Sequence, residues 1–225
     1  FTADVSAFDP DEWQFATIEF NTDDTHPGTG APTVVLSQDF TDATFPPTDW
    51  TIYNVDAGGS TWARDIAQSA SAPASAKHAY SCTADQEGWL VTPQVAIPAT
   101  NATILSFNQR GNYVDDLVYH GIWVSTATNA IADFVEVALA PAPPEDAWTT
   151  TPVSVDLSAY AGQNIYVAFR YTGYCADDWW VDDVQVLNVP AGDPISDVHL
   201  PLAVLPTASN LPAMAKFETH RDAGA

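Results

Sequence analysis

Short runs in which apolar and polar residues alternate occupy the middle of the chain. Their apolar members are mostly Val, Ile, Tyr and Trp, and Pro, Gly, Asn and Asp separate the runs. Alternation with period two is typical of strands with one buried face. The pattern predicts strands at 34–38, 50–54, 89–97, 103–109, 118–125, 134–139, 153–157, 165–171 and 179–187.

No segment repeats its apolar residues with the period of a helix. The stretch 67–76 is rich in Ala and Ser, yet it has no apolar face and contains Pro73, so we expect a loop there. Many short strands separated by Pro and Gly favour an all-β sandwich or barrel.

Two extensions flank these strands. The first contains one strand pattern, WQFATIEF at 13–20, and the second is rich in Pro and Ala and contains the apolar stretch HLPLAVLP at 199–206. We expect one domain at 33–188, an N-terminal extension at 1–32 and a C-terminal extension at 189–225. Ordering an extension has to be offset by contacts, either with its own domain or with a neighbouring copy.

Acidic residues outnumber basic ones by 29 to 6, which gives a formal net charge of −23. Nucleic acid needs a basic surface and an anionic membrane repels an acidic one, so we expect neither as a partner. No apolar run has the length of a membrane span. Of the acids, 23 are Asp, which favours turns and calcium-binding loops. Most would form a solvated surface, and a few are candidates for holding calcium.

Cys82 and Cys175 are the only cysteines, and both lie in loop-like contexts. They form either two free thiols or one disulfide. A disulfide would close a loop of more than ninety residues, which is worth about 4–5 kcal/mol in the chain-entropy model. It would also fit a secreted or cell-surface protein.

The last predicted strand, WWVDDVQVL, contains two adjacent acids. Strict alternation puts Asp182 on the same face as Val184 and Val186, near the core. A buried carboxylate needs a partner. One solution is an arginine, Arg64 or Arg170, together with backbone hydrogen bonds. The other is calcium, whose six to eight oxygen ligands would come from several converging loops.

Eight short motifs lie along the same region. They are Asp39-Phe40, FPPTDWT (45–51), GWLVTP (88–93), LSF (105–107), WVST (123–126), DLSAYAGQ (156–163), AFRY (168–171) and VDDV (181–184). In order and spacing they resemble the choice-of-anchor J or cleaved-adhesin domains, which are jelly-roll relatives of the MAM domain and include the adhesin domains of bacterial gingipains. The resemblance covers about residues 34–188 and leaves both extensions outside.

The resemblance implies a two-sheet antiparallel jelly-roll β-sandwich with bound Ca2+ and no catalytic centre. In the family, acidic residues near the opening motif and in the closing DDV contribute calcium oxygens. The matching positions in this chain are Asp39, Asp42 and one or both of Asp182 and Asp183.

One position departs from the family pattern. The family often has Glu directly after the opening Phe, where this chain has Thr41. Either Asp42 substitutes for that ligand or the ligand is missing. Asp56 lies in an acidic, Gly-rich turn before a Trp, and it is a candidate for a second calcium site.

Catalysis finds little support in the motifs. The histidines lie far apart and lack metalloprotease spacing, so we expect surface or loop positions for His26, His78, His120, His199 and His220. No nucleophile elbow and no phosphate-binding loop is present in the sequence. We therefore predict that the chain is not an enzyme.

Glycan binding is a rival function, because jelly rolls commonly bind sugars and this chain has eight Trp. The candidate contacts are Trp179, Trp180, Tyr113 and Tyr119. The motif positions of four other tryptophans suggest core residues instead: Trp50, Trp62, Trp89 and Trp123.

Self-assembly is the other rival. The strand pattern at 13–20 suits addition to the sheet edge of a neighbouring subunit, with Trp13, Phe15, Ile18 and Phe20 as the assembly residues. Such a head-to-tail contact makes an open filament when it does not close. Alternatively, both extensions fold back and cover the edges of their own sandwich.

These patterns together predict a non-catalytic, extracellular, calcium-binding β-sandwich that acts in surface attachment or self-assembly, as in a filament or a surface layer. Its partners would be other copies of itself or surface glycans and polymers. The alternative is a carbohydrate-binding or accessory adhesin domain of a larger secreted enzyme, such as a peptidase.

Overall fold

The computed structural model describes residues 14–20, 31–56, 59–190 and 198–204. The chain divides into two compact units, one made of Gly30–Pro190 and the other of Phe1–Thr29 with Ala191–Ala225. Each unit is described by itself below.

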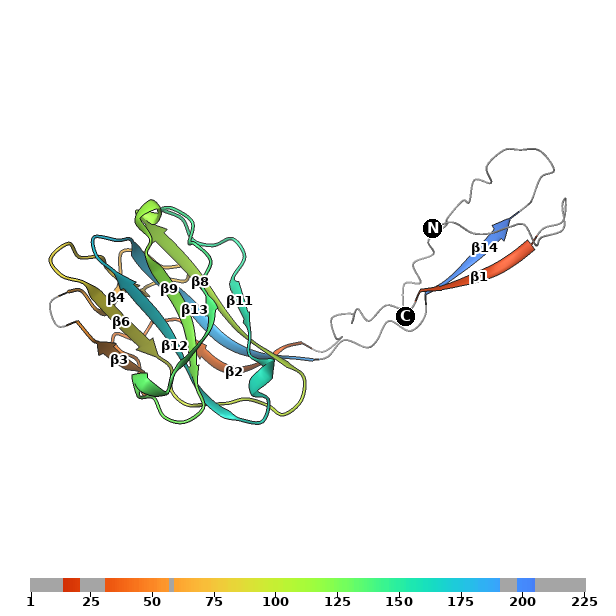
Figure 1. Ribbon diagram of the computed structural model, residues 1–225, viewed down its shortest axis with the longest axis horizontal. Helices are drawn as coiled ribbons and strands as arrows, with labels where there is room; N and C mark the ends of the chain where they lie inside the picture. The colour runs from red at the N-terminus through yellow and green to blue at the C-terminus, as the bar shows by residue number, and fades with distance from the viewer. Residues whose placement is uncertain (1–13, 21–30, 57–58, 191–197, 205–225) are drawn as a thin grey trace. The chain divides into compact units, whose positions relative to one another are not determined.

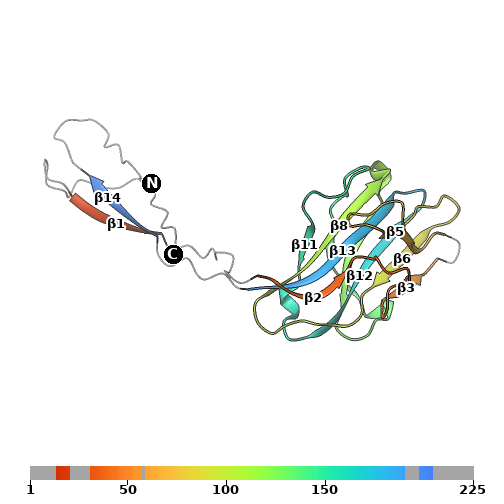
Figure 2. The same cartoon turned by 180° about the vertical axis from the view of Figure 1, so that it is seen from behind.

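The larger unit is a sandwich of two antiparallel sheets (Figures 1 and 2). In the first, which we call the β12 sheet, the order is β10 (Val135–Leu139), β9 (Tyr119–Ser125), β12 (Asn164–Gly173), β6 (Gln86–Val91) and β3 (Thr51–Asn54), and β7 (Val95–Ala96) also pairs with β12. In the second, the β13 sheet, the order is β11 (Val153–Asp156), β8 (Ala102–Asn112), β13 (Asp178–Val189), β5 (Ser75–His78) and β4 (Trp62–Asp65), and β2 (Thr33–Gln38) pairs with β13. Single-turn 3-10 helices lie in the connections at Val114–Asp116, Ile131–Asp133 and Ser158–Tyr160.

The core lies between the two sheets, where alternate side chains of each strand meet. Phe107 of β8 packs edge-on against Phe169 of β12, with ring centroids 5.1 Å apart. Leu105, Ile122 and Val167 are fully buried in the same cluster. Burial of this apolar surface is the main force that holds the sheets together. The all-β, two-sheet antiparallel sandwich that the sequence predicts is therefore confirmed.

A β-bulge interrupts β13 and corrects the expected placement of Asp182. The register of β13 on β8 shifts between Asp182 and Gln185, and Asp183 has a φ of 49°. The extra residue resets the alternation, so that Val181 and Val184 both enter the core. Asp182 consequently does not share a face with Val184, and it is buried for another reason given below.

Two strands of the sandwich were not expected from the pattern. β4 and β5 have four residues each, WARD and SAKH, and neither has a run of apolar residues. The first two residues of β5 belong to the stretch 67–76, for which we expected a loop. Similarly, the strand expected at 89–97 is two strands, β6 and β7, separated by residues 92–94.

In the smaller unit, the two extensions pair with each other. β1 (Gln14–Phe20) runs antiparallel to β14 (Val198–Val204), with Gln14 opposite Val204 and Phe20 opposite Val198. β1 overlaps the strand expected at 13–20, but Trp13 lies outside the described residues, as do 1–12, 21–30, 191–197 and 205–225. Among the residues that the structure describes, no helix is long and apolar enough to cross a membrane.

Candidate functional site

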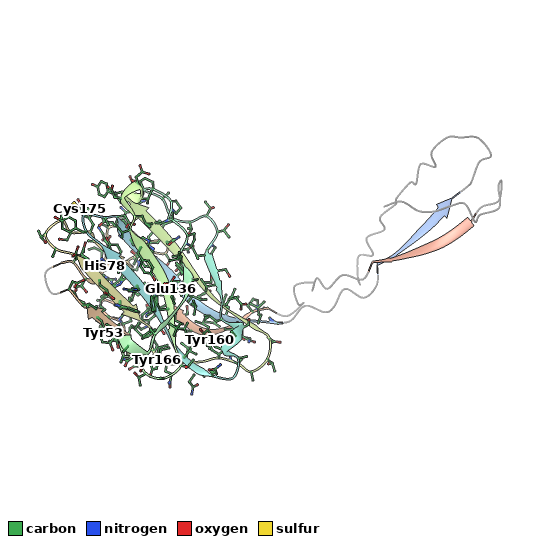
Figure 3. All side chains as sticks on the ribbon, in the orientation of Figure 1. Tyr53, His78, Glu136, Tyr160, Tyr166 and Cys175 are labelled. Carbon is green, nitrogen blue, oxygen red and sulfur yellow. A yellow bond between two sulfur atoms is a disulfide. The ribbon has the colours of Figure 1, made fainter. Side chains whose placement is uncertain are left out.

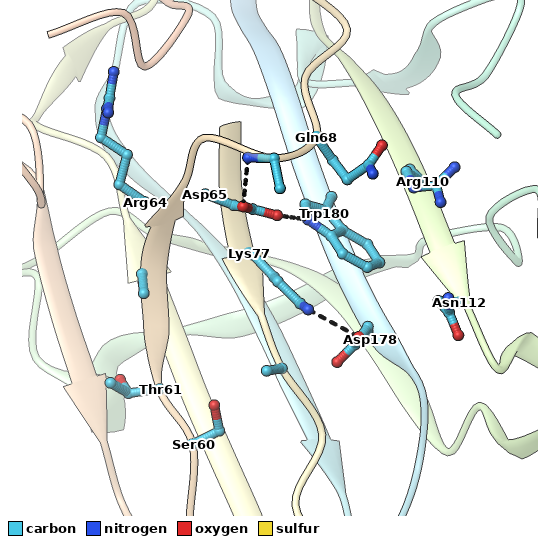
Figure 4. A pocket seen from close by; sticks show the side chains of 13 residues that line it. Ser60, Thr61, Arg64, Asp65, Gln68, Lys77, Arg110, Asn112, Asp178 and Trp180 are labelled. Carbon is cyan, nitrogen blue, oxygen red and sulfur yellow. Dashed lines mark hydrogen bonds and ion pairs between the residues drawn. The ribbon is translucent and has the colours of Figure 1, made fainter. Parts of the chain in front are cut away.

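Three neighbouring strands of the β13 sheet place a lysine, a tryptophan and an arginine side by side. Trp180 of β13 lies opposite Lys77 of β5 on one side and opposite Arg110 of β8 on the other. Because residues that are opposite in register share a face, all three belong to the outer face of the sheet, away from the core. We call them the Lys77–Trp180–Arg110 row (Figure 4).

Both cations of the row contact the tryptophan ring. The Nζ atom of Lys77 lies 4.2 Å from the ring centroid of Trp180, and the guanidinium carbon of Arg110 lies 5.4 Å from it. The Nε1–H of Trp180 donates to Asp65. Cation–π contact of this kind fixes the positions of long basic side chains that would otherwise be mobile.

Each cation also has one acidic partner. Lys77 Nζ lies 2.8 Å from an oxygen of Asp178, and Arg110 Nη2 donates to Asp146 at 2.8 Å. Asp178 uses its other oxygen to accept a hydrogen bond from the backbone N–H of Tyr80 at 2.9 Å. Acidic partners therefore hold both cations of the row in position within the protein itself.

The row lies in a groove of about 440 Å³. Its walls come from β4, β5, β8, β13 and the segments next to β4 and β5, and most of the lining residues are polar. The lining residues beyond the row are Ser60, Thr61, Ala63, Arg64, Asp65, Ala67, Gln68, Ala79, Asn112 and Asp178. Three of the six basic residues in the whole sequence line this one groove.

An exposed aromatic pair adjoins the groove. Tyr80 and Tyr113 follow the lining residues Ala79 and Asn112 in sequence, and they are 38% and 51% exposed. Their rings meet edge to face with centroids 5.4 Å apart. Two exposed tyrosines therefore stand beside a polar groove.

The expected glycan contacts do not share one surface. Trp179 is fully buried, so that prediction is wrong: it points into the core, where its Nε1–H donates to Gln109 at 3.0 Å. Tyr119 belongs to the β12 sheet, where its hydroxyl donates to Glu136 and accepts from Trp123. Only Trp180 and Tyr113 of the four lie at or beside the groove.

The Asp182–Asp183 pair is held by hydrogen bonds rather than by an arginine. Asp182 accepts from the backbone N–H groups of Ala70 and Ser71 at 2.8 and 3.0 Å, and from the N–H of Asp183 at 2.8 Å. Asp183 accepts from the Ser71 hydroxyl at 2.6 Å and from Asn108 Nδ2 at 3.0 Å. The loop after β4 thus covers Asp182, and this burial raises the pKa of Asp182 to about 6.

The Asp39–Asp42 loop already has a cation. Arg64 donates through Nε to the carbonyl of Phe40 and through Nη2 to that of Thr41, both at 3.0 Å. Asp39 accepts from the N–H and hydroxyl of Thr41, and Asp42 accepts from the N–H of residue 44. These turn hydrogen bonds lower the pKa of Asp39 and of Asp42.

These contacts do not fit the calcium site that the resemblance implies. The described residues contain no group of three or more His, Cys, Asp and Glu side chains placed to hold a metal ion. All four oxygens of the Asp182–Asp183 pair accept hydrogen bonds. Asp56 lines a different pocket, of about 390 Å³, with Asp85 and Glu87. Calcium binding therefore stays a prediction from the resemblance.

Cys82 and Cys175 form a disulfide across a sequence separation of 93. Figure 3 shows Cys175 at one end of the sandwich. The bond ties the segment between β5 and β6 to the turn between β12 and β13. The disulfide alternative of the sequence prediction is thus the one that the structure has.

A buried cluster with two histidines was not expected, and it corrects their predicted surface positions. His78 of β5 stacks on Tyr171 with ring centroids 4.0 Å apart, and His120 of β9 stacks on Trp179 at 4.1 Å. His120 Nε2 lies 3.1 Å from an oxygen of the fully buried Asp177. Side chains alternate along β5, so His78 points into the core because Lys77, the residue before it, points outward.

The histidines of this cluster are kept neutral. Burial lowers the pKa of His78 to about 3, and burial also lowers the pKa of His120, although Asp177 acts in the opposite direction. Within the described residues, neither ring nitrogen of His78 has a hydrogen-bond partner. The cluster lies in the core.

Comparison with known proteins places this sandwich among adhesin domains. The chain is 27% identical over 194 residues to Hemagglutinin A of Porphyromonas gingivalis (strain ATCC BAA-308 / W83); the match covers 71% of this chain and 8% of that much longer protein. The K1 cleaved adhesin domain of Lys-gingipain from Porphyromonas gingivalis W83 superposes with a TM-score of 0.52 at 22% identity, covering 70% of this chain and 98% of that domain. The K3 domain superposes with a TM-score of 0.50 at 22% identity, with 68% and 98% covered.

The two superpositions confirm the fold alone. The family model described as the Cleaved Adhesin Domain matches residues 33–186, which is more than half of the chain. The resemblance read from the eight sequence motifs is thereby confirmed: the chain belongs to the cleaved adhesin domain family.

Proposed function

We propose that this chain is a non-catalytic, extracellular attachment module that binds surface carbohydrate in the groove over the Lys77–Trp180–Arg110 row. Membership of an adhesin family supports attachment, and a matched relative bears the name Hemagglutinin A. The Cys82–Cys175 disulfide supports an oxidising compartment outside the cytosol, as at a cell surface or in a secreted protein.

The observation that carries the proposal is the groove itself. Its volume of about 440 Å³ lies in the range of small-molecule sites. Gln68 and Asn112 offer amide donors and acceptors, and Asp65 and Asp178 offer acceptors for sugar hydroxyls. Tyr80 and Tyr113 present exposed rings with polar tips beside it, a combination that suits the mixed surface of a sugar.

A glycan array probed with the full chain tests this function. Ala63 is exposed, lines the groove and lies opposite Lys77, so Ala63→Trp fills the groove without removing a polar contact. Exposed Ala127, in the loop after β9, gives the matched control Ala127→Trp. We expect Ala63→Trp to lose the array signal and Ala127→Trp to keep it. Equal binding by the two variants would place the carbohydrate site elsewhere.

A second candidate, self-assembly, is favoured by the pairing of β1 with β14. The register pairs Ala16 with Leu202, Ile18 with Leu200 and Phe20 with Val198, and only the fourth pair of this alternating set, Gln14 with Val204, has a polar member. A two-stranded sheet is marginally stable alone, and an apolar face gains stability when it is covered. We therefore place the assembly contact on this face against the same face of a second copy, rather than on a strand added to the sandwich edge.

Light scattering of the full chain tests the assembly candidate. We expect Ile18→Asp and Leu200→Asp, which lie opposite each other in register, to reduce the molar mass to that of one chain. Thr17→Asp, on the other face of the same strand, is the control and should leave the molar mass unchanged. A single-chain mass for the unchanged protein at high concentration would reject self-assembly.

A further inference from the structure

Charge is distributed very unevenly over this protein. With a formal net charge of −23 it has only six basic residues, yet Arg64, Lys77 and Arg110 line one groove. Arg64 lies opposite the core residue Ala76 and donates to carbonyls of another loop, so Lys77 and Arg110 are the two cations that the groove offers, beside the acidic lining residues Asp65 and Asp178. In a chain this acidic, two adjacent cations are the charges of the groove that can attract an anionic group.

The two cations of the row are fixed rather than free. Neighbouring strands are about 4.8 Å apart, so Lys77 and Arg110 flank Trp180 at backbone positions roughly 10 Å from each other. Both lie against the ring of Trp180, and Lys77 is also 2.8 Å from Asp178. Cations that are already positioned lose little conformational freedom when a ligand binds.

Each cation keeps hydrogen-bonding capacity for a ligand. Arg110 uses Nη2 for Asp146 and its Nε is buried, while no hydrogen bond joins its Nη1 to another residue of the described part of the chain. The ammonium of Lys77 has three donor protons and one acidic neighbour, Asp178. Asp146 is 59% exposed, so its pair with Arg110 is weakened by solvent and a ligand anion can compete with it.

We infer that this groove selects sugars that carry a carboxylate, such as uronic or sialic acids, and seats the carboxylate at Lys77 and Arg110. The inference rests on the carbohydrate attachment proposed above and names the ligand class of that site. A carboxylate is planar and matches the forked donors of a guanidinium. The side chain of Gln68 remains for the hydroxyl groups of the same sugar, and Asp65, Asp178 and Asn112, although already hydrogen-bonded within the protein, keep lone pairs that can accept from hydroxyls.

Isothermal titration of the full chain at pH 7 tests the ligand class with matched probes. Trigalacturonic acid is compared with its methyl ester, and 3′-sialyllactose with lactose, so that each acid has a neutral counterpart and the two sources of carboxylate are separated. A hydrogen bond to a charged group contributes about 1.5–3 kcal/mol, which corresponds to roughly tenfold or more in affinity. We expect at least one acid to bind tenfold or more tightly than its neutral counterpart.

Variants then assign the preference to the row. Lys77→Gln and Arg110→Gln should each reduce the ratio of acid to neutral affinity towards one. Arg170→Gln removes the same charge from the β12 sheet and is the control, in which the ratio should persist. Melting temperatures of all three variants establish that each one is folded before its affinity is compared.

Three results would overturn the inference, and they differ in what else they reject. Equal binding of acid and neutral sugars refutes acid selection while carbohydrate attachment stands. A preference that survives in both Lys77→Gln and Arg110→Gln shows that the carboxylate binds elsewhere. Binding of no sugar, on titration and on the array, refutes both the ligand class and the proposed function.

Discussion

The two faces of β13 have the same residue types, Asp and Trp, in different surroundings. Asp177, directly before the strand, and Trp179 face the core, whereas the next residue in each case, Asp178 or Trp180, faces the groove. On the inner face the basic partner of the aspartate is His120, and on the outer face it is Lys77.

The two faces differ in their access to water. In the core, burial disfavours a charged imidazole, so the bases there are histidines whose pKa is lowered. In the groove, Lys77 and Arg110 each pair with an acidic side chain, Asp178 or Asp146. One strand thereby separates an aromatic interior from the charged residues of the groove by a shift of one residue.

The largest predicted effect is the loss of stability when each of the two adjacent tryptophans of β13 is replaced. Trp179→Ala should lower the free energy of unfolding by about 3–5 kcal/mol, because it leaves a closed cavity in the core. Trp180→Ala should cost less, about 1–3 kcal/mol, since water can enter the gap from the groove. Urea denaturation measures both. If the two variants lose equal stability, the contrast between the faces is wrong.

Lowering the pH should reduce the stability of the fold through the histidines of the inner face. Unfolded histidine binds a proton below about pH 6.5, whereas folded His78, with its pKa lowered to about 3, does not, so unfolding is favoured as the pH falls. Each such histidine costs about 1.4 kcal/mol per pH unit below 6.5. The raised pKa of Asp182, about 6, has the opposite sign, because the folded carboxyl keeps its proton between about pH 4 and 6 and gains stability there.

Denaturation at pH 6.5, 5.5 and 4.5 measures the balance. His120, whose pKa is also lowered, acts in the same direction as His78, and Asp182 acts against both below about pH 6, so we expect a net loss of stability as the pH falls. His78→Phe keeps the ring that stacks on Tyr171 and removes the titrating group. Its slope should therefore be shallower by about one histidine, and an unchanged slope would exclude His78 as the source.

Asp182 is a third case, because it is buried under the loop after β4 and not in the core between the sheets. Its oxygens accept three backbone N–H groups. In Asp182→Asn an amide N–H2 replaces one of these acceptors, which should cost about 1–3 kcal/mol. The control is Asp183→Asn, where the Ser71 hydroxyl can turn to accept instead, so its loss should be smaller. Equal losses in denaturation would show that the loop after β4 is not held by Asp182.

The sequence was sufficient for the fold and for part of the groove. Periodicity and motif order identified the sandwich, and Trp180 and Tyr113 were named as candidate sugar contacts. Three features were beyond it. The bulge at Asp183 is set by pairing with β8, β4 and β5 are too short to show a pattern, and the Lys77–Trp180–Arg110 row depends on the register of three strands distant in sequence. The burial of His78 was missed because its segment was not assigned to a strand, and that of His120 was missed although 118–125 was predicted as one.

The smallest predicted effect concerns the third cation of the groove lining. Unlike Lys77 and Arg110, Arg64 spends its donors on the carbonyls of Phe40 and Thr41, in the loop for which the resemblance implies calcium. Because a guanidinium already neutralises this loop, we expect the melting temperature to be the same in EDTA and in millimolar calcium. Arg64→Gln should lose about 1 kcal/mol, the worth of the lost hydrogen bonds. Ligand binding to the folded state always raises the melting temperature, so a rise of several degrees in calcium would show that the Asp39–Asp42 loop and the Asp182–Asp183 pair rearrange to hold the ion.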